Sequence, residues 1–327
     1  MNATCSVAYH LLMTERVVLE QGSSVSSRRR EFKRYWPLYV MVAPAVVSII
    51  VFSYVPYFGL SIAFMDFSIV RGYFASPWVG LKHFNDAFQN PFFSQAFRNT
   101  VIIKFGQTLV GFPSAVILAL LINEVASKWY KRTVQTATML PYFISWIVIA
   151  AMFRNIFTPE YGIVNQVLLH VFGRTDPFIV LSHPQRFRIF IILQDTWRFA
   201  GFFAVIYLAS ISAIDPTLYE VAEVDGASRW KQTRHITLPS IAPTMVTLFV
   251  MLIGYLVIGS FEQVFAQYNV AVYQTADILE TLTFRLGIQQ GRFSFATAIG
   301  LFQSVIAVFL VIGTNWFVRR VGQEGLF

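Results

Sequence analysis

Six apolar stretches constrain the fold of this 327-residue chain more than any other feature. Each is long enough to cross the hydrocarbon core of a bilayer, which takes about 20 residues of helix. The stretches cover residues 35–64, 101–123, 134–157, 187–212, 241–267 and 295–318. We therefore expect an all-α integral membrane protein with six transmembrane helices, and internal proline and glycine residues predict kinks in several of them.

The composition agrees with a membrane protein. Hydrophobic residues make up 56% of the chain and charged residues only 13%, against roughly 25% charged in a typical soluble domain. A net charge of +8 would suggest a nucleic-acid partner for a soluble protein, whereas here it fits the Lys/Arg excess of cytoplasmic loops beside membrane lipid. Cys5 is the only cysteine, so neither a disulfide nor a cysteine-rich metal site is expected.

Clusters of basic residues predict the orientation in the membrane. Residues 1–34 form a polar tail, expected to be mobile, which ends in a basic run and lacks the apolar core of a cleavable signal peptide. Because basic clusters tend to stay on the cytoplasmic side, we expect both termini and the polar segment 213–240 in the cytoplasm. The clusters consist of Arg28, Arg29, Arg30, Lys33 and Arg34, of Lys128, Lys131 and Arg132, and of Arg319 and Arg320.

The polar segment between the fourth and fifth stretches has the pattern of a helix, a turn and a second helix. Asp215 can cap a helix that starts at Pro216, because proline at the first helical position loses an N–H that has no partner there anyway. Gly226 fits the left-handed residue that ends such a helix. We expect a second short helix from residue 227 to about 235, which Pro239 stops. An ordinary solvated loop with turn residues is the alternative.

This segment resembles the EAA signature of the permease subunits of bacterial binding-protein-dependent ABC importers. The matching residues are Glu220-x-Ala222, Asp225-Gly226-Ala227 and Ile236-x-Leu238-Pro239. The chain departs from the signature at Val221, where alanine is usual, although valine is also small and apolar. The runs 54–60 and 76–84 are similar to oligosaccharide-type members, so the resemblance covers nearly everything after the basic tail.

The resemblance implies the type I fold of ABC importer permeases, with a six-span permease domain over residues 35–327 and the segment 213–240 as a cytoplasmic coupling helix. It implies a multi-pass protein of the bacterial cytoplasmic (inner) membrane that works with a homologous second permease, two ATPase subunits and an extracytoplasmic solute-binding protein. No G-x-x-x-x-G-K-[ST] motif occurs, so ATP and Mg²⁺ are expected on the ATPase subunits, and this chain is expected to hold no cofactor and no catalytic residue.

The coupling segment of this family docks on the ATPase subunits, and the resemblance assigns roles to its residues here. Glu220, Asp225 and Arg229 would supply polar contacts, and the small Ala222 and Ala227 would permit close approach. The residues expected to couple the chain to its ATPases are Glu220, Ala222, Asp225, Gly226, Ala227, Arg229, Leu238 and Pro239.

Polar residues inside the apolar stretches are candidates for a substrate path, because such residues are expensive in hydrocarbon and face a bundle interior or a cavity. A sugar needs hydroxyl partners and aromatic faces, which these side chains can supply. The candidates are Lys104, Gln107, Tyr142, Trp146, Asp195, Trp197, Arg198, Glu262 and Gln263. Structural roles are the alternative: Asp195 and Arg198 stand three residues apart and can neutralise each other, and Lys104 can snorkel to the interface.

The likeness is greatest to oligosaccharide and polyol permeases and, within them, to the membrane subunits of alginate importers. An acidic oligosaccharide is then the expected substrate, with another saccharide or a polyol as the alternative. For an acidic sugar, the cations Lys104, Arg154 and Arg198 are candidate partners of its carboxylates.

The residues alone leave two other classes of function open. A membrane-embedded enzyme that builds or modifies a glycan would need clustered carboxylates or histidines, and a sensory or scaffolding protein would bind a signalling partner through the polar segment. The histidines lie far apart in the sequence and form no H-E-x-x-H pattern, and no G-x-S-x-G motif occurs, so we expect neither a metal site nor a catalytic site. The histidines are His10, His83, His170, His183 and His235.

Overall fold

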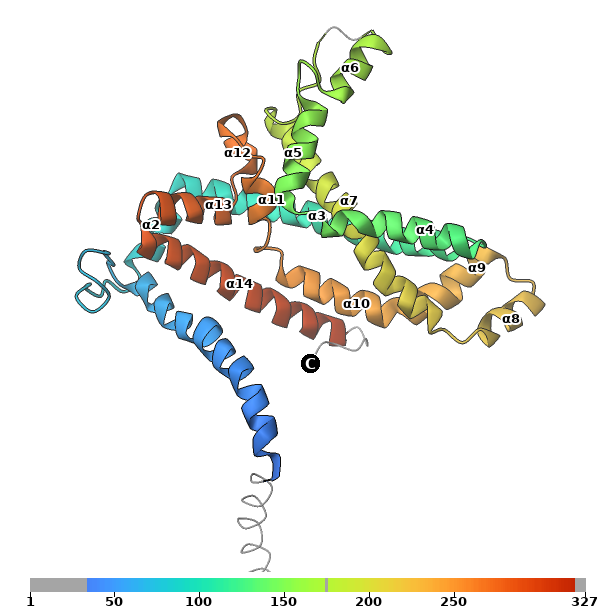
Figure 1. Cartoon of the computed structure of the whole chain (residues 1–327), viewed down its shortest axis with the longest axis horizontal. Coiled ribbons are helices and arrows are strands. Elements are labelled where there is room, and N and C mark those ends of the chain that lie inside the picture. The colour runs from blue at the N-terminus through green and yellow to red at the C-terminus, as the bar shows by residue number, and fades with distance from the viewer. Residues whose placement is uncertain (1–33, 174–175, 321–327) are drawn as a thin grey trace, which may run out of the picture. The chain divides into compact units, whose positions relative to one another are not determined.

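The computed structural model describes residues 34–173 and 176–320, and these are almost entirely helical (Figure 1). This part of the chain contains no β-strand, only an isolated antiparallel bridge between Met65 and Trp78. Five of its helices are long and apolar enough to span a membrane, and a bent pair of helices raises the number to six. The expected all-α membrane fold is confirmed. The residues of the predicted tail that lie outside the described ranges include Cys5, His10, Arg28, Arg29, Arg30 and Lys33.

The chain divides into two units, residues 1–61 and 62–327. The described part of the first unit belongs to one apolar helix, Arg34–Phe64, whose last residues are part of the second unit. The helix is apolar around its whole circumference, as is typical of a membrane span. The first predicted span is therefore confirmed. Within the helix, the regular winding gives way to a π-helical turn η1 (Ile50–Tyr54) and a 3₁₀ segment η2 (Val55–Phe64).

The second unit consists of helices of very different length. Its long helices are α3 (Pro91–Asn123), α7 (Pro184–Ser212), α10 (Leu238–Gly254) and α14 (Phe293–Arg320). Its short helices are α2 (Lys82–Gln89), α4 (Lys128–Met139), α5 (Trp146–Phe157), α6 (Ile163–His170), α8 (Thr217–Val224), α9 (Arg229–Gln232), α11 (Phe261–Phe265), α12 (Tyr273–Ala276) and α13 (Leu279–Phe284). The remaining turns are the 3₁₀ turns η3 (Leu140–Phe143) and η5 (Val270–Val272) and the π-helical turns η4 (Thr233–Thr237) and η6 (Arg285–Gln289).

Three further predicted spans are confirmed as single helices. α3, α7 and α14 contain the predicted stretches 101–123, 187–212 and 295–318 and extend beyond them. α3 and α7 each begin at a proline, whose missing N–H would have no partner in the first turn. The Asn90 side chain also accepts a hydrogen bond from the Phe92 N–H at 2.9 Å and fixes the start of α3.

The third predicted span, 134–157, is not one helix. The segment Lys128–Phe143 runs up to a break, and α5 leaves the break at an angle of 102°. Pro141 lies in the last turn before the break and cannot donate a backbone hydrogen bond. Beyond it, the Ser145 hydroxyl caps α5 by accepting the Val148 N–H at 3.4 Å. The predicted span is therefore present as a bent pair of helices, with the break just after Pro141, as expected for a span with an internal proline.

The fifth predicted span, 241–267, has the wrong bounds. The helix begins at Arg229 and continues through α9, η4 and α10 to Gly254. Pro239 does not stop a short helix, as predicted, but lies in the first turn of α10 directly after η4. The wider i→i+5 bonding of a π-helical turn accommodates a residue that has no N–H. The second helix predicted for the polar segment is therefore the beginning of this span, and residues 255–267 form a loop and the short α11.

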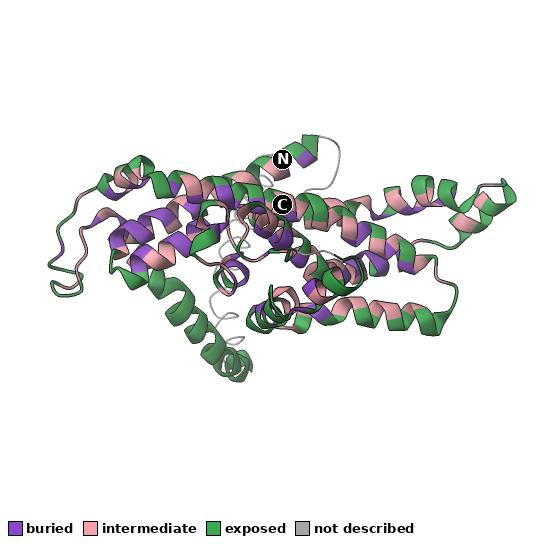
Figure 2. Ribbon diagram, turned by 90° about the horizontal axis from the view of Figure 1, so that it is seen from above, coloured by how far each residue is buried: buried purple, intermediate pink, exposed green. Residues whose placement is uncertain are grey.

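The core of the second unit lies where its long helices face one another, as the buried residues in Figure 2 show. α3 packs along α7, and α10 packs against α14. The small side chains of Ala115, Ala119 and Ala204 let α3 and α7 approach closely. Gly201 of α7 brings this helix against the end of α4, because a Cβ at Gly201 would lie only 2.8 Å from the Met139 backbone nitrogen. These contacts hold fixed the helices that surround a cavity.

Candidate functional site

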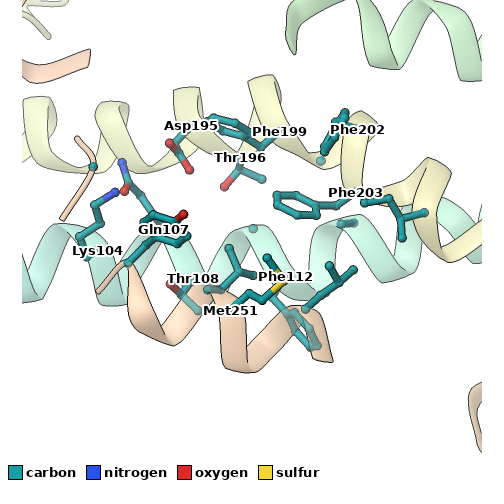
Figure 3. Close-up of a pocket in the computed structure, with 18 of the residues that line it drawn as sticks. Lys104, Gln107, Thr108, Phe112, Asp195, Thr196, Phe199, Phe202, Phe203 and Met251 are labelled. Atoms are coloured by element: carbon teal, nitrogen blue, oxygen red, sulfur yellow. The ribbon is translucent and has the colours of Figure 1, made fainter. Parts of the chain in front are cut away.

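A cavity of about 570 Å³ lies between α3, α7 and α10. Figure 3 shows side chains of α3 and α7 that face it from two sides. Two stretches of non-helical or 3₁₀ backbone also line it: η3 just before the break in the third span, and the loop 255–260 that follows α10. The cavity therefore lies beside the break in the third span and the end of the fifth.

The lining changes in character along the cavity. At one end, α3 contributes Lys104 and Gln107 and α7 contributes Asp195 and Thr196 (Figure 3). Aromatic side chains dominate the rest, and the rings of Tyr142 and Phe202 stack at 4.1 Å between centroids. The other aromatic residues of the lining are Phe112, Phe199, Phe203, Tyr207 and Tyr255. The cavity thus combines a charged, hydrogen-bonding end with broad ring faces.

Lys104 and Asp195 bring opposite charges to opposite walls of the polar end. Within the described part of the chain, neither side chain makes a direct ion pair or hydrogen bond, although the two attract each other electrostatically. Both side chains are half-buried. Charged groups inside a membrane-spanning bundle are costly unless they serve a ligand or a partner, so this pair is a candidate functional position.

Buried glutamines connect the cavity to the helices behind it. Gln107 donates to Gln263 Oε1 at 2.9 Å, and Gln263 donates to Gln194 Oε1 at 3.1 Å. Gln194 Oε1 also accepts from Gln267 Nε2 at 2.8 Å. The four amides lie on α3, α7 and the segment around α11, and all are nearly inaccessible to solvent. A satisfied buried network of this kind fixes the orientation of each amide.

The loop 255–260 is held by three other elements. The Glu280 carboxylate of α13 accepts the backbone N–H groups of Gly259 and of Ser260, the latter at 3.2 Å. Gln303 of α14 donates to the Val257 carbonyl at 2.8 Å. The Ser260 hydroxyl donates to Gln107 of α3 at 3.2 Å. Gly259 has a φ of +100°, which a residue with a side chain rarely adopts, so the loop depends on glycine there.

The predicted path residues fall into three groups. Lys104, Gln107, Tyr142 and Asp195 line the cavity. Trp146, Arg198 and Gln263 lie behind the lining, where Arg198 stacks on Trp146 at 4.3 Å and donates to the Tyr142 carbonyl at 3.3 Å. The third group does not line the cavity. Trp197 and Glu262 are exposed, and Arg154, the remaining cation predicted to bind a carboxylate, donates to the Ala266 carbonyl at 3.3 Å.

Several residues of the site were missed in the sequence. Gln194 directly precedes Asp195 in the same span, so its polarity was a usable signal. Phe199, Phe202 and Phe203 recur at the spacing of one helix face, which would have placed them together on α7. Gln267 lay inside the wrongly extended fifth span, and its partner on α7 could not be known before the fold.

The polar segment 213–240 forms a second candidate site. The Asp215 carboxylate accepts the Thr217 N–H at 2.9 Å, which lowers the pKa of Asp215 because the bond favours its ionised form. Gly226 has a φ of +73° and follows the end of α8, so the predicted left-handed glycine is confirmed. Asp215 accepts the predicted capping bond, although the helix begins at Thr217 and not at Pro216. The Tyr219 hydroxyl lies 2.9 Å from the Thr237 hydroxyl, and Arg229 lies 3.9 Å from the Glu124 carboxylate at the end of α3.

Several apolar side chains of this segment are exposed. Leu218, Val221 and Val224 of α8 are 49%, 62% and 89% exposed, and Trp230 of α9 is 70% exposed. Ala222 and Ala227 are half-buried, and Glu220, Asp225 and Arg229 are exposed. Leu238 and Pro239 lie within the continuous helix instead of ending one.

Comparison with known proteins places the chain in a family. The family model described as "Binding-protein-dependent transport system inner membrane component" matches residues 111–323. The polygalacturonan/rhamnogalacturonan transport system permease protein YteP of Bacillus subtilis (strain 168) is 37% identical over 290 residues, which cover 89% of this chain and 90% of that protein.

Chains of two crystal structures share the fold, each with a TM-score of 0.82. One structure is of a bacterial ABC transporter involved in the import of the acidic polysaccharide alginate; its chain is 39% identical, and the match covers 89% of this chain and 98% of that one. The other is a bacterial alginate ABC transporter in complex with an alginate pentasaccharide-bound periplasmic protein, 38% identical, with 91% and 99% covered. The chain therefore belongs to the family of binding-protein-dependent transport system inner membrane components, and it is a multi-pass sugar permease of an ABC importer with the type I fold, not an enzyme.

Proposed function

We propose that this permease carries an oligosaccharide from an extracytoplasmic binding protein into the cytoplasm by ATP-driven alternating access, through the cavity between α3, α7 and α10. The observation that carries the proposal is the position of that cavity beside the break in the third span and the non-helical loop that follows α10. Backbone without regular helical bonds is tolerated at membrane depth where it is buried or lines a cavity, and transporter sites form at such discontinuous helices.

The chemistry of the lining supports a saccharide as the cargo. Hydroxyl groups need charged or polar partners, which Lys104, Gln107, Asp195 and Thr196 supply, and sugar rings pack on aromatic faces such as Tyr142. An acidic oligosaccharide is the substrate class we favour, because one relative is named for polygalacturonan transport and another for import of the acidic polysaccharide alginate. A different saccharide or a polyol is the alternative.

Partner proteins complete the proposed importer. A related alginate transporter forms a complex with a substrate-bound periplasmic protein, so we infer a solute-binding protein for this chain as well. We infer further a homologous second permease and two ATPase subunits that bind ATP and Mg²⁺, since this sequence has no phosphate-binding loop of its own. The proposed location is the bacterial inner membrane, with both termini in the cytoplasm.

The segment 213–240 is the proposed contact with the ATPases. Its exposed Leu218, Val221 and Val224 offer an apolar face, which would be unfavourable in water without a partner. Around that face, Glu220, Asp225 and Arg229 can form polar contacts, while Ala222 and Ala227 leave room for close approach. Gly226, with its left-handed backbone, sets the angle between α8 and the long helix from Arg229 to Gly254. It therefore determines how a movement of α8 is transmitted to that helix.

Reconstitution of the complete importer in proteoliposomes tests these proposals. With alginate pentasaccharide as the probe, binding protein outside and ATP available to the ATPases, we expect saccharide uptake coupled to ATP hydrolysis. Gly226→Pro should abolish coupled uptake, because proline cannot adopt a φ of +73°. Gly173→Pro is the matched control, since Gly173 has a φ of +63° on a different loop.

Each result bears on one part of the proposal. Wild-type uptake by Gly226→Pro, with the same coupling to ATP hydrolysis, would overturn the role of the segment. Glu220→Lys should also uncouple hydrolysis from uptake while the protein stays in the membrane. If the complete importer hydrolysed ATP without moving any saccharide tested, the transport proposal itself would fail.

A further inference from the structure

We propose that Lys104 determines the specificity of this permease for a saccharide that carries a carboxylate, by binding one uronate carboxylate at the polar end of the cavity while Asp195 accepts a hydroxyl of the same sugar. This inference rests on the proposed function and assigns recognition of the sugar's carboxylate to a single side chain. It is carried by four observations: the position of Lys104, the absence of a direct partner, the partners of the nearby carboxylates, and the contacts of the other cations.

Lys104 and Asp195 face the cavity from α3 and α7, and Figure 3 shows both labelled side chains at the same end of it. The Lys104 ammonium lies beside the loop 255–260, where a Cβ at Gly259 would be 3.7 Å from Nζ. Within the described ranges neither charged group has a direct ion pair or hydrogen bond. A sugar unit between the two walls can therefore reach a donor on one side and an acceptor on the other.

Neither carboxylate near Lys104 makes an ion pair with it. Asp195 stands three residues before Arg198 on α7, so the two share a helix face, and it is attracted by both Arg198 and Lys104. Glu280 accepts the N–H groups of Gly259 and Ser260 at the start of α11, where a helix N-terminus favours negative charge. Lys104 thus brings to the cavity a charge that has no directly bonded counterpart among the described residues.

The side chains of the other two cations expected to bind carboxylates do not line the cavity. Arg198 stacks on the rings of Trp146 and Phe199 and donates to the Tyr142 carbonyl. Arg154 donates to the Ala266 carbonyl. Of the three cations predicted to bind carboxylates, Lys104 is the one that lines the cavity. We therefore assign carboxylate recognition to Lys104.

The same arrangement limits how much negative charge the site accepts. Lys104 can pair with one carboxylate through a charge-assisted hydrogen bond, which is stronger than a bond to a neutral hydroxyl. A second carboxylate at the same end would approach Asp195 and Glu280, whose negative charges repel it. An acidic oligosaccharide would therefore present its uronate units to Lys104 one at a time.

Binding to the detergent-solubilised importer, measured by calorimetry without the binding protein, isolates the membrane cavity. The probes are alginate pentasaccharide and the same pentasaccharide after reduction of its carboxyl groups. Lys104→Gln should weaken binding of the acidic probe about 10- to 100-fold, the loss typical of one charge-assisted hydrogen bond, and leave the reduced probe unchanged. Lys104→Arg should retain the preference for the acidic probe, because it keeps the charge.

Arg154→Gln is the matched control, because it neutralises a cation that does not line the cavity and should leave binding of both probes unchanged. Unchanged binding of the acidic probe by Lys104→Gln, or equal weakening of both probes, would overturn the assignment to Lys104. If the wild-type importer takes up saccharide with no preference between the probes, the inference fails while the proposed function stands. If it neither binds nor imports either probe, the proposed saccharide substrate fails as well.

Discussion

The guanidinium of Arg198 touches both halves of the broken third span: it donates to the Tyr142 main-chain carbonyl at 3.3 Å and lies 4.3 Å from the ring centroid of Trp146. Tyr142 precedes the break and Trp146 follows it. A helix that ends inside the membrane leaves carbonyls without helical partners. Arg198 satisfies one of them and fixes the second half of the span against the same α7 side chain.

Replacing Arg198 by Gln should loosen this break. We expect the free energy of unfolding of the detergent-solubilised protein to fall by about 1–3 kcal/mol, since one hydrogen bond to a charged group and a desolvated cation–π contact are lost. Arg186→Gln is the control, because Arg186 makes the same two kinds of contact, with the Ile179 carbonyl at 3.1 Å and the Phe178 ring at 5.0 Å, but its hydrogen bond is exposed whereas that of Arg198 is partly buried. Equal losses in the two variants would contradict a special role for Arg198.

Gly201→Ala should disrupt the contact between α7 and the end of α4. The added methyl would collide with the Thr138 carbonyl and lie 2.8 Å from the Met139 nitrogen, and backbone atoms cannot move aside as a flexible side chain can. We expect a loss of about 1–3 kcal/mol in unfolding free energy, measured by thermal or denaturant unfolding. Gly300→Ala in α14 meets no atom within 4 Å and should be neutral or slightly stabilising.

The glutamine network predicts a non-additive pair of substitutions. Gln263→Leu leaves the Gln107 amide without its acceptor and should destabilise the protein by about 1–3 kcal/mol, the cost of an unsatisfied buried donor. Adding Gln107→Leu removes that donor, so the double variant should lose less than the sum of the single variants. A double-mutant cycle on unfolding free energies checks this, and strict additivity would rule out coupling through the shared hydrogen bond.

The Asp215 cap predicts a pH dependence of α8. The Thr217 N–H lowers the pKa of Asp215 in the folded protein, so its stabilising effect is present above the unfolded pKa near 4 and is lost as pH falls through the lower folded value. Hydrogen exchange of the α8 amides, corrected for intrinsic rates, should show protection falling in that acid range. Asp215→Asn keeps a capping acceptor that does not titrate, so its α8 protection should change less with pH.

The spans were predictable where hydropathy and helix signals agree. In α3 and α7 an apolar run follows an initial proline, and both predictions held. The third span is bent just after its internal proline, and the bounds of the fifth were wrong because the helix is shifted along the apolar run. Ser145 caps a new helix inside the third predicted span. In the fifth span, the helix continues from the π-helical turn through Pro239, which was expected to end a helix.

The polar residues of the cavity were predictable in kind, while their grouping was not. Lys104, Gln107 and Asp195 stood out because charge and amide groups are rare in apolar stretches. That Lys104 and Asp195 face one cavity, whereas Trp197 and Glu262 do not, depends on how α3, α7 and α11 pack. Such long-range placement has no signature in a single sequence.

The unbroken helix from Arg229 to Gly254 would act as a lever in the proposed coupling to the ATPases. Its 26 residues measure about 39 Å at roughly 1.5 Å per residue, from the polar segment at one end to the edge of the cavity at the other. A tilt of about 5° imposed at Arg229 therefore displaces the tip beside Tyr255 by roughly 3 Å, which is comparable to the diameter of a water molecule. Had Pro239 ended the helix, that displacement would have been lost in a flexible joint.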